Sequence, residues 1–274
     1  GFLIAWGYWI SVWASLPAIA FAFAGSLMNL LPAFNNKPMA LALTLGAIWA
    51  VVGINLRGVK AVGLFAEVTT YAKLLPFGAI AVVGLFYVRG ENLSEFNPSG
   101  EPLLSAAAAL APLTMFAYLG LESATVPAGD VRDAQRTIPR ATIIGIAIAA
   151  ALYVFGTIVV LGVVPREQLL GSVAPFADAA RLMWGEGAAL AVALAVIVSS
   201  IGALNGWTLL MGQVPMAAAQ DKLFPGAFGR LSARGVPALG IVISAALATL
   251  LVAFQASGSP GVRAFYNLLV SLST

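Results

Sequence analysis

Three ionisable side chains fall inside long hydrophobic stretches of this 274-residue sequence: Glu67, Lys73 and Glu122. A charged group at the centre of a bilayer is costly, so residues of this kind usually serve a site in the interior of a helix bundle. Carboxylates and an amine at that depth suit the binding of a charged solute or the transfer of a proton. These three positions are therefore the first candidates for a functional site.

Glu122 lies in the segment Tyr118-Leu-Gly-Leu-Glu-Ser-Ala124. Gly120 permits backbone torsions that a continuous helix avoids, and a broken helix at membrane depth is tolerated where it lines a cavity. Such a break would free the carbonyl groups of Phe116 and Leu119 to accept hydrogen bonds from a substrate ammonium. Glu122 would then begin a second half-helix, whose dipole favours its negative charge. The alternative is an unbroken helix in which Glu122 forms a salt bridge.

Lys73 lies well inside its hydrophobic stretch, in Thr69-Thr-Tyr-Ala-Lys-Leu-Leu-Pro76. Its amine is a candidate to release and rebind a proton in each functional cycle. The alternative is that the side chain extends to the membrane surface, as long charged side chains do. Glu67 is nearer the preceding loop, and we interpret it as an interfacial or structural carboxylate.

Aromatic side chains mark two further positions. Trp207 lies inside a hydrophobic stretch, in Leu204-Asn-Gly-Trp-Thr-Leu-Leu210, rather than at a membrane–water interface, where Trp is usually enriched. It would either wall a ligand cavity or fill the bundle core. Tyr8 and Ser11, in the first hydrophobic stretch, leave the same two alternatives open.

The composition indicates which elements position these residues. The sequence is 61% hydrophobic and 9% charged, whereas an ordinary soluble domain is about 25% charged. A helix needs about 20 apolar residues to cross a bilayer, and uncharged runs of that length recur along the chain. The run 141–164 lacks the alternation of a barrel strand. We therefore expect an all-α, polytopic membrane helix bundle.

We expect one transmembrane domain, 1–274, with eight hydrophobic segments. Their approximate bounds are 2–31, 39–56, 62–88, 103–126, 141–164, 187–216, 237–254 and 264–274. The loops richer in Lys and Arg are taken as cytoplasmic, which places Gly1 inside. Between the segments we expect an amphipathic interfacial helix at 174–184 and a short cytoplasmic helix at 217–231, broken at Pro225. The last segment is short and no initiator Met is present, so we interpret the chain as a fragment.

Missing residue types exclude several kinds of chemistry. Cys and His are both absent, which excludes disulfides, zinc sites built from these ligands and histidine-based relays. No basic run with interleaved aromatic residues suggests nucleic acid, and no catalytic set suggests an enzyme. We expect no cofactor, no metal and no catalytic residue.

Three motifs together carry a family resemblance. They are Gly120-Leu-Glu-Ser-Ala124 followed by Arg132, Arg136, Ile138-Pro139 and Ala141-Thr142; Ala174-Pro-Phe-Ala-Asp-Ala-Ala180; and Gly206-Trp-Thr-Leu-Leu210 followed by Asp221 and Leu223-Phe-Pro225. The chain resembles the amino acid/polyamine/organocation transporters, in particular the bacterial basic amino acid/polyamine antiporters of the arginine/agmatine type. The resemblance implies a parent of twelve helices with a five-plus-five inverted repeat, of which this chain supplies about helices 3 to 10.

The resemblance also implies roles for single residues. Phe116 would be a gate over the substrate, and Leu119 and Gly120 would contact its amino group. Tyr8 and Glu122 would belong to an inner gate, Trp207 would form the cavity floor, and Ser11 and Val12 would line the side-chain pocket. Two residues depart from the pattern of the antiporters. Phe116 stands in place of Trp, and Leu16 stands in place of Asn, which removes an amide that would contact a polar substrate head group.

Lys73 stands, by the same resemblance, near the position where sodium-coupled relatives hold a cation. Ser199 or Ser200, on a later segment, would be its partner in proton coupling. Both serines are kept as candidates.

The sequence thus predicts a secondary active transporter of the bacterial inner membrane that exchanges amino acids or their amine products by alternating access. One alternative is a proton-coupled symporter of neutral or other amino acids, and another is a non-transporting membrane sensor on the same scaffold. The expected partners are a small amino acid or amine, protons and membrane lipid. A homodimer stays open.

Overall fold

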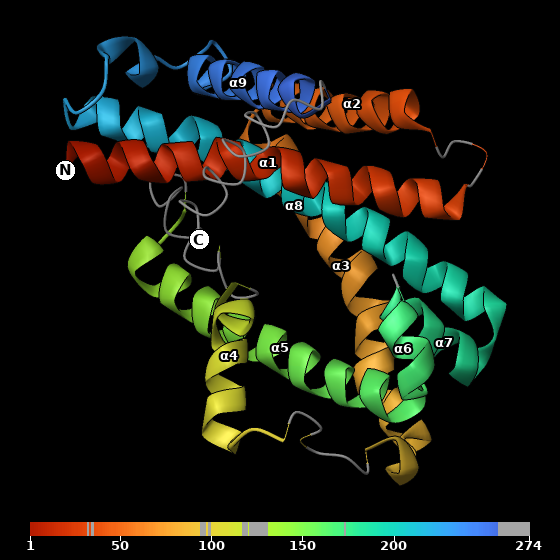
Figure 1. Ribbon diagram of the computed structural model, residues 1–274. Helices are drawn as coiled ribbons and strands as arrows, with labels where there is room; N and C mark the ends of the chain where they lie inside the picture. Colours follow the sequence, from red (N-terminus) through yellow and green to blue (C-terminus); the bar gives the residue numbers. More distant parts are fainter. Residues whose placement is uncertain are drawn as a thin grey trace. The chain divides into compact units, whose positions relative to one another are not determined.

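The computed structural model describes residues 1–31, 33, 36–93, 97, 100–116, 120, 131–172 and 174–256, and regular structure in these ranges is entirely helical (Figure 1). Five helices of the described chain are long and apolar enough to cross a membrane: Phe2–Met28, Lys37–Asn55, Val59–Tyr87, Ala134–Val163 and Glu186–Gln220. A shorter apolar helix covers Ala238–Phe254. The prediction of an all-α, polytopic membrane protein is confirmed.

The helices follow the order of the predicted segments. They are α1 (Phe2–Leu30), α2 (Lys37–Asn55), α3 (Val59–Val83), α4 (Leu103–Phe116), α5 (Ala134–Val163), α6 (Arg166–Gly171), α7 (Pro175–Trp184), α8 (Glu186–Gln220) and α9 (Ala238–Ala256). Short 3-10 turns occupy Gly84–Tyr87 (η2), Gly90–Leu93 (η3) and Gly226–Gly229 (η6). The predicted segment 264–274, and residues 121–126 of the fourth segment, lie outside the described residues.

Local sequence signals account for several helix ends. Asn36 caps α2, because its side-chain Oδ1 accepts a hydrogen bond of 2.9 Å from the backbone N–H of Met39. Pro38 lies in the first turn of that helix, where its missing N–H costs nothing. Gly185 follows α7 with φ of +87°, a conformation that glycine adopts without strain. Capping groups thus separate consecutive helices where hydrophobicity alone gives no boundary.

Two predicted boundaries differ from the structure. The fifth helix begins at Ala134 rather than at 141, because its first turns carry arginines that a search for apolar residues does not count. The separate helix predicted at 217–231 is wrong: the alanine-rich residues 217–220 continue α8. The chain then turns at Lys222, whose φ is +60°, and forms only η6 after Pro225.

The amphipathic helix predicted at 174–184 is present as α7, and its interfacial location stays a prediction. Its alanines at 177, 179 and 180 are buried, whereas Arg181, Leu182 and Trp184 are exposed. Pro175 occupies its first turn. The helix is therefore amphipathic, with one face against its neighbours and a polar or interfacial face outside.

The described residues form two compact units. Unit 1 comprises those of Gly1–Lys73 and Val196–Thr274, and unit 2 those of Leu74–Ala195. Helices α3 and α8 each contribute one part to each unit. In unit 1, α1 packs against α2 and α9.

Small residues allow close helix packing within unit 1. A Cβ added to Gly212 of α8 would lie 2.6 Å from the side chain of Ile241 on α9, and one added to Gly240 would lie 3.2 Å from the carbonyl oxygen of Met211. Glycine at both positions lets the two backbones approach, as is common between membrane helices. Helix α9 is thereby fixed against the second half of α8.

Unit 2 has its own apolar core. Its buried residues come from α3, α5, α7 and the start of α8, and include Ile80, Val159, Ala180 and Val192. The rings of Phe77 and Phe176 meet edge to face, with centroids 5.4 Å apart. This core fixes the end of α3 and η2 against α5 and α7.

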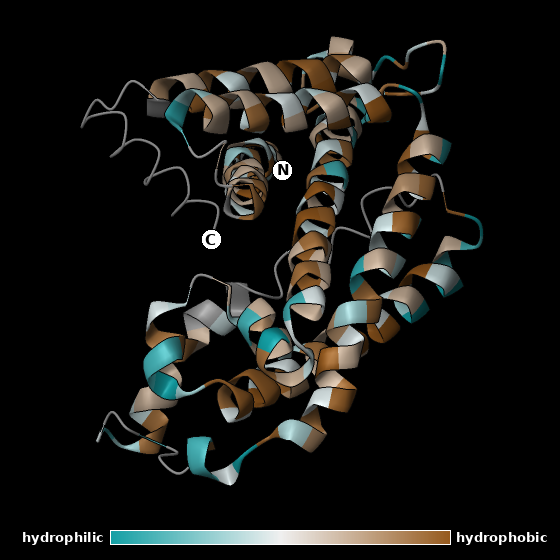
Figure 2. Cartoon of the chain, turned by 90° about the vertical axis from the view of Figure 1, so that its right-hand side faces the viewer, coloured by the Kyte–Doolittle hydropathy of each residue, from teal (hydrophilic) through white to brown (hydrophobic). Residues whose placement is uncertain are grey.

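The long helices are apolar on their exposed surfaces as well as where they contact one another. Figure 2 shows hydrophobic residues around most of the circumference of the long helices, with hydrophilic residues gathered mainly near helix ends and connections. Large apolar side chains such as Ile4, Leu104 and Phe86 are strongly exposed. A helix that is apolar on all sides belongs in a protein core or in a membrane, so these faces suit lipid.

Candidate functional site

The fourth hydrophobic segment departs from helical geometry at Gly120. Helix α4 ends at Phe116, and Gly120 lies in a turn with φ of +94°, whereas residues of an α-helix have φ of about −63°. Gly120 itself is therefore not helical, which is compatible with the predicted break, while residues 117–119 and 121–130 on either side lie outside the described residues. Leu119 and Glu122 lie outside the described residues, as does the side chain of Phe116, so their roles stay predictions.

The predicted residues of α1 lie on neighbouring turns of one helix. The hydroxyl group of Ser11 donates a 2.8 Å hydrogen bond to the carbonyl oxygen of Tyr8, and that of Ser15 donates a 2.7 Å bond to the carbonyl oxygen of Ser11. Val12 is fully buried, and so is Leu16 one turn later on the same face. This face of α1 is thus apolar at the position where the resemblance would place an amide.

Helices α3 and α8 run antiparallel in unit 1. The side-chain amide of Asn205 donates a 3.2 Å hydrogen bond to the carbonyl oxygen of Val62. Nearer the C-terminus of α3 and nearer the N-terminus of α8, a Cβ added to Gly202 would lie only 2.7 Å from Oγ1 of Thr69. These two contacts define which face of each helix meets the other.

That register bears on Lys73 and its predicted partners. Lys73 follows Thr69 by four residues and lies on the same face of α3, whereas Glu67 lies about 200° from Thr69 around the helix. Ser199 precedes Gly202 by three residues and shares its face of α8, whereas Ser200 lies about 200° from Gly202. Ser200 donates to the carbonyl oxygen of Val196 in its own helix, at 2.9 Å.

Lys73 is half-buried, and none of the described carboxylates forms an ion pair with it. Glu67 is exposed, and its interpretation as an interfacial or structural carboxylate stays a prediction. By helical periodicity, Lys73 and Ser199 thus lie on the sides of α3 and α8 that carry Thr69 and Gly202, whereas Glu67 and Ser200 lie on other sides; the pairing of Lys73 with Ser199 stays a prediction.

A buried amide pair was not identified as a site feature in the sequence. Asn55 of α2 donates from Nδ2 to Oδ1 of Asn205 at 3.1 Å and to the carbonyl oxygen of Val51 at 2.9 Å. Both side chains are fully buried. Together with the bond to Val62, they join α2, α3 and α8. The available signal was an asparagine inside each hydrophobic segment, which is weaker than that of a charged residue.

Trp207 follows Asn205 by two residues and so lies about 200° around α8 from it. Because Asn205 is directed toward α2 and α3, Trp207 is on the opposite face of α8. It is half-buried. Among the described residues, no group of three or more acidic side chains is arranged to hold a metal ion.

An aromatic cluster joins α1 to the connection between α8 and α9. Nε1 of Trp9 donates a 2.8 Å hydrogen bond to Oγ of Ser244 on α9, and its ring meets Phe224 and Phe228 at centroid distances of 5.6 and 5.7 Å. Those phenylalanines belong to the connection between α8 and α9. This cluster ties that connection to the first part of α1.

Comparison with known proteins agrees with this architecture. The sequence profile of a family described as amino acid permease matches residues 1–274. The chain is 31% identical to the putative arginine/ornithine antiporter of Bacillus subtilis (strain 168), over 89% of the chain and 56% of that protein. It is 28% identical to the putrescine transporter PotE of Escherichia coli (strain K12), over 99% of the chain and 62% of that protein.

A third relative, the cadaverine/lysine antiporter of Escherichia coli (strain K12), is 27% identical over 89% of the chain and 55% of its own length. The chain thus spans between 55% and 62% of the length of these relatives. All three are named as transporters or antiporters rather than as enzymes. The predicted family resemblance and the prediction of a multi-pass inner-membrane protein are confirmed.

Proposed function

This chain belongs to the amino acid permease family, and from that membership we propose that the whole protein is a secondary active transporter that exchanges an amino acid for an amine or a second amino acid. The departure of Gly120 from helical geometry, four residues after the last described residue of α4, is the observation that carries the proposal. A helix interrupted at membrane depth exposes carbonyl oxygens that accept hydrogen bonds from a cationic amine. The names of the three relatives, each for an amino acid or amine carrier, support the same class of substrate.

We assign the substrate contacts as follows. The backbone around Leu119 and Gly120 holds the amino group, and Phe116 covers it as a gate. Ser11 and Val12 line the pocket for the substrate side chain. Leu16, fully buried beside Val12, offers that pocket no hydrogen bond, so selection there depends on shape and apolar contact.

The remaining proposed positions open and close the path. Trp207 forms the floor of the cavity, and Tyr8 and Glu122 belong to an inner gate. Alternating access needs no covalent step, so the protein is not assigned a catalytic residue or a cofactor. A homodimer remains a prediction that size determination in detergent would test.

Coupling to protons is assigned to Lys73 with Ser199. The close approach of Thr69 to Gly202 sets the two helix faces together at this level, and no described carboxylate neutralises the amine. Loss of a proton from Lys73 would remove a charge at the α3–α8 contact, and regaining it would restore that charge. The relatives' names do not favour the alternatives of a neutral amino acid symporter or a membrane sensor.

The experiment is a counterflow assay with the full-length protein reconstituted in liposomes. The vesicles are loaded with unlabelled arginine, ornithine, lysine, putrescine or cadaverine, and uptake of each labelled compound is followed. We expect uptake of at least one compound that depends on an internal substrate. Protein-free vesicles serve as the control. Absence of exchange for all five compounds, with protein inserted and folded, would overturn the proposal.

A further inference from the structure

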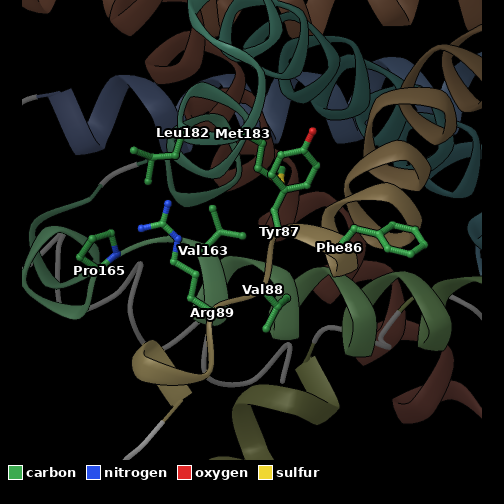
Figure 3. Close-up of a pocket in the computed structure, with 8 residues that line it drawn as sticks. All are labelled: Phe86, Tyr87, Val88, Arg89, Val163, Pro165, Leu182 and Met183. Atoms are coloured by element: carbon green, nitrogen blue, oxygen red, sulfur yellow. The ribbon is translucent and has the colours of Figure 1, made fainter.

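A cavity of about 370 Å³ opens at one end of unit 2, within the range of about 300–1,000 Å³ typical of small-ligand sites. It lies between η2, the end of α5 and α7, and is lined by Phe86, Tyr87, Val88, Arg89, Val163, Pro165, Leu182 and Met183. Figure 3 shows the guanidinium group of Arg89 directed into the space bounded by Val163, Pro165 and Leu182. The cavity thus combines mainly apolar side chains with the guanidinium group of Arg89, which is an exposed residue.

The backbone holds Arg89 in place. Its N–H donates a 2.9 Å hydrogen bond to the carbonyl oxygen of Gly162, which also accepts a 2.9 Å bond from the side chain of Asn92. A Cβ added to Gly162 would lie 2.6 Å from the side chain of Val88, so α5 and this segment are in close contact. Arg89 is therefore fixed at the end of α5, while its guanidinium group extends from that anchor.

The guanidinium group of Arg89 has no hydrogen bond or ion pair with any described residue. Arg181, on nearby α7, is different: it donates 2.8 Å and 2.5 Å bonds to Glu186 and Asp178. The hydrogen bond to Glu186, with that to Asp178, raises the pKa of Arg181 above its usual value. One arginine of this region is paired with carboxylates, whereas the guanidinium group of the other has no partner among the described residues and is accessible to a ligand.

The cavity lies at the level where membrane-crossing helices end. Helix α5 ends at Val163, and the apolar stretch that contains α3 ends at Tyr87. The ring of Tyr87 meets that of Trp184 edge to face, with centroids 6.1 Å apart. Tyr and Trp concentrate at membrane–water interfaces, so this pair places the mouth of the cavity among lipid head groups.

The outer walls of the cavity are formed by exposed apolar side chains. Phe86 is 87% exposed and Leu182 is 50% exposed, and Figure 3 shows the Phe86 ring directed away from Arg89. Exposed apolar residues continue along α3 at Val82 and along α5 at Leu161. A soluble anion would leave these surfaces uncovered, whereas an acyl chain would cover them.

We propose that this cavity binds an anionic phospholipid, with its phosphate on Arg89 and its acyl chains against Phe86 and Leu182. Arginine pairs with phosphate through two parallel hydrogen bonds, and basic pockets between membrane helices bind anionic head groups. A zwitterionic lipid such as phosphatidylcholine carries a quaternary ammonium beside its phosphate, which places a positive charge near Arg89, so it binds less tightly. The site differs from the transport site proposed above and does not depend on it.

Native mass spectrometry of the full-length protein in detergent tests this site. Phosphatidylglycerol and phosphatidylcholine are titrated in the absence of any transport substrate, so the result does not depend on the proposed exchange. We expect the wild-type protein to prefer phosphatidylglycerol. Arg89→Gln should weaken phosphatidylglycerol binding about tenfold, and Arg89→Lys, which keeps the charge but loses the paired geometry, should have an intermediate effect.

Arg136→Gln is the matched control, because Arg136 is exposed on the first turns of α5 and its loss removes the same charge. It should leave phosphatidylglycerol binding unchanged. The proposal is overturned if Arg89→Gln binds like the wild type, or if both glutamine variants lose affinity equally, which would indicate general charge attraction. It is also overturned if glycerol 1-phosphate, which lacks acyl chains, binds as tightly as phosphatidylglycerol. Monodispersity of each variant on size exclusion confirms that it is folded.

Discussion

Gly202 allows α3 and α8 to approach, and Gly202→Ala should separate them. The added Cβ would lie 2.7 Å from Oγ1 and 3.0 Å from Cβ of Thr69, closer than side-chain atoms normally come. Thr69 cannot move aside freely, because it is buried and its hydroxyl bonds the carbonyl oxygens of Phe65 and Ala66 at 2.9 and 3.1 Å. Relief therefore requires a shift of the helices themselves.

The magnitude follows from two opposing effects. Overpacking of a well-packed contact costs about 1–3 kcal/mol, whereas replacing glycine by alanine inside a helix gains about 0.5–1 kcal/mol. The difference of these two ranges is a net loss of about 0–2.5 kcal/mol for Gly202→Ala, with a central value of about 1 kcal/mol. Gly206, on the same helix, has no atom within 4 Å of an added Cβ, so Gly206→Ala should be neutral or stabilising.

Thermal unfolding of the purified full-length variants in one detergent measures this difference. We expect a lower melting temperature for Gly202→Ala and an unchanged or higher one for Gly206→Ala. Thr69→Ala removes the atom nearest the added Cβ, so the double variant Thr69→Ala/Gly202→Ala should show a favourable coupling energy. Equal melting temperatures for the two glycine variants would refute the close α3–α8 contact and with it the register that aligns Lys73 and Ser199.

Three further substitutions test the site and its supports. Gly120→Ala places a side chain at φ of +94°, which costs about 1–2 kcal/mol of strain, and it should reduce exchange in liposomes. Gly145→Ala, in the regular part of α5 with open space around it, should leave exchange unchanged. Equal activity of the two variants would contradict a role for the break. Lys73→Ala should flatten the pH dependence of exchange. Ser199→Ala should cause a similar change, and Ser200→Ala should cause none. If Lys73→Ala leaves both the pH profile and the rate of exchange unaltered, Lys73 has no role in coupling. Asn205→Ala removes hydrogen bonds that join three helices and should lower stability by about 1 kcal/mol. Thr208→Ala should cost less, because the hydroxyl group of Thr208 bonds only Leu204 of its own helix. The reverse order in thermal unfolding would be inconsistent with the buried amide pair.

The sequence alone determined the class of the protein. Length and apolarity of the runs decide that a segment crosses a membrane, because the bilayer imposes a fixed thickness whatever the neighbouring helices do. The non-helical backbone at Gly120 was also readable, since glycine adopts that conformation without strain. The amphipathic helix α7 was visible for a similar local reason: its polar and apolar residues separate by helical period.

Tertiary structure decided the features that depend on which helix faces meet. A lysine inside a span gives no indication of its partner, and the sequence left Ser199 and Ser200 equal. The contacts of Thr69 with Gly202 and of Asn205 with Val62 fix the rotation of α3 and α8, and that rotation separates the two serines. The cavity at Arg89 was equally hidden, because its walls come from three segments that are distant in the sequence. Local composition sets which residues leave water, whereas the pairing of their faces is a property of the packed chain.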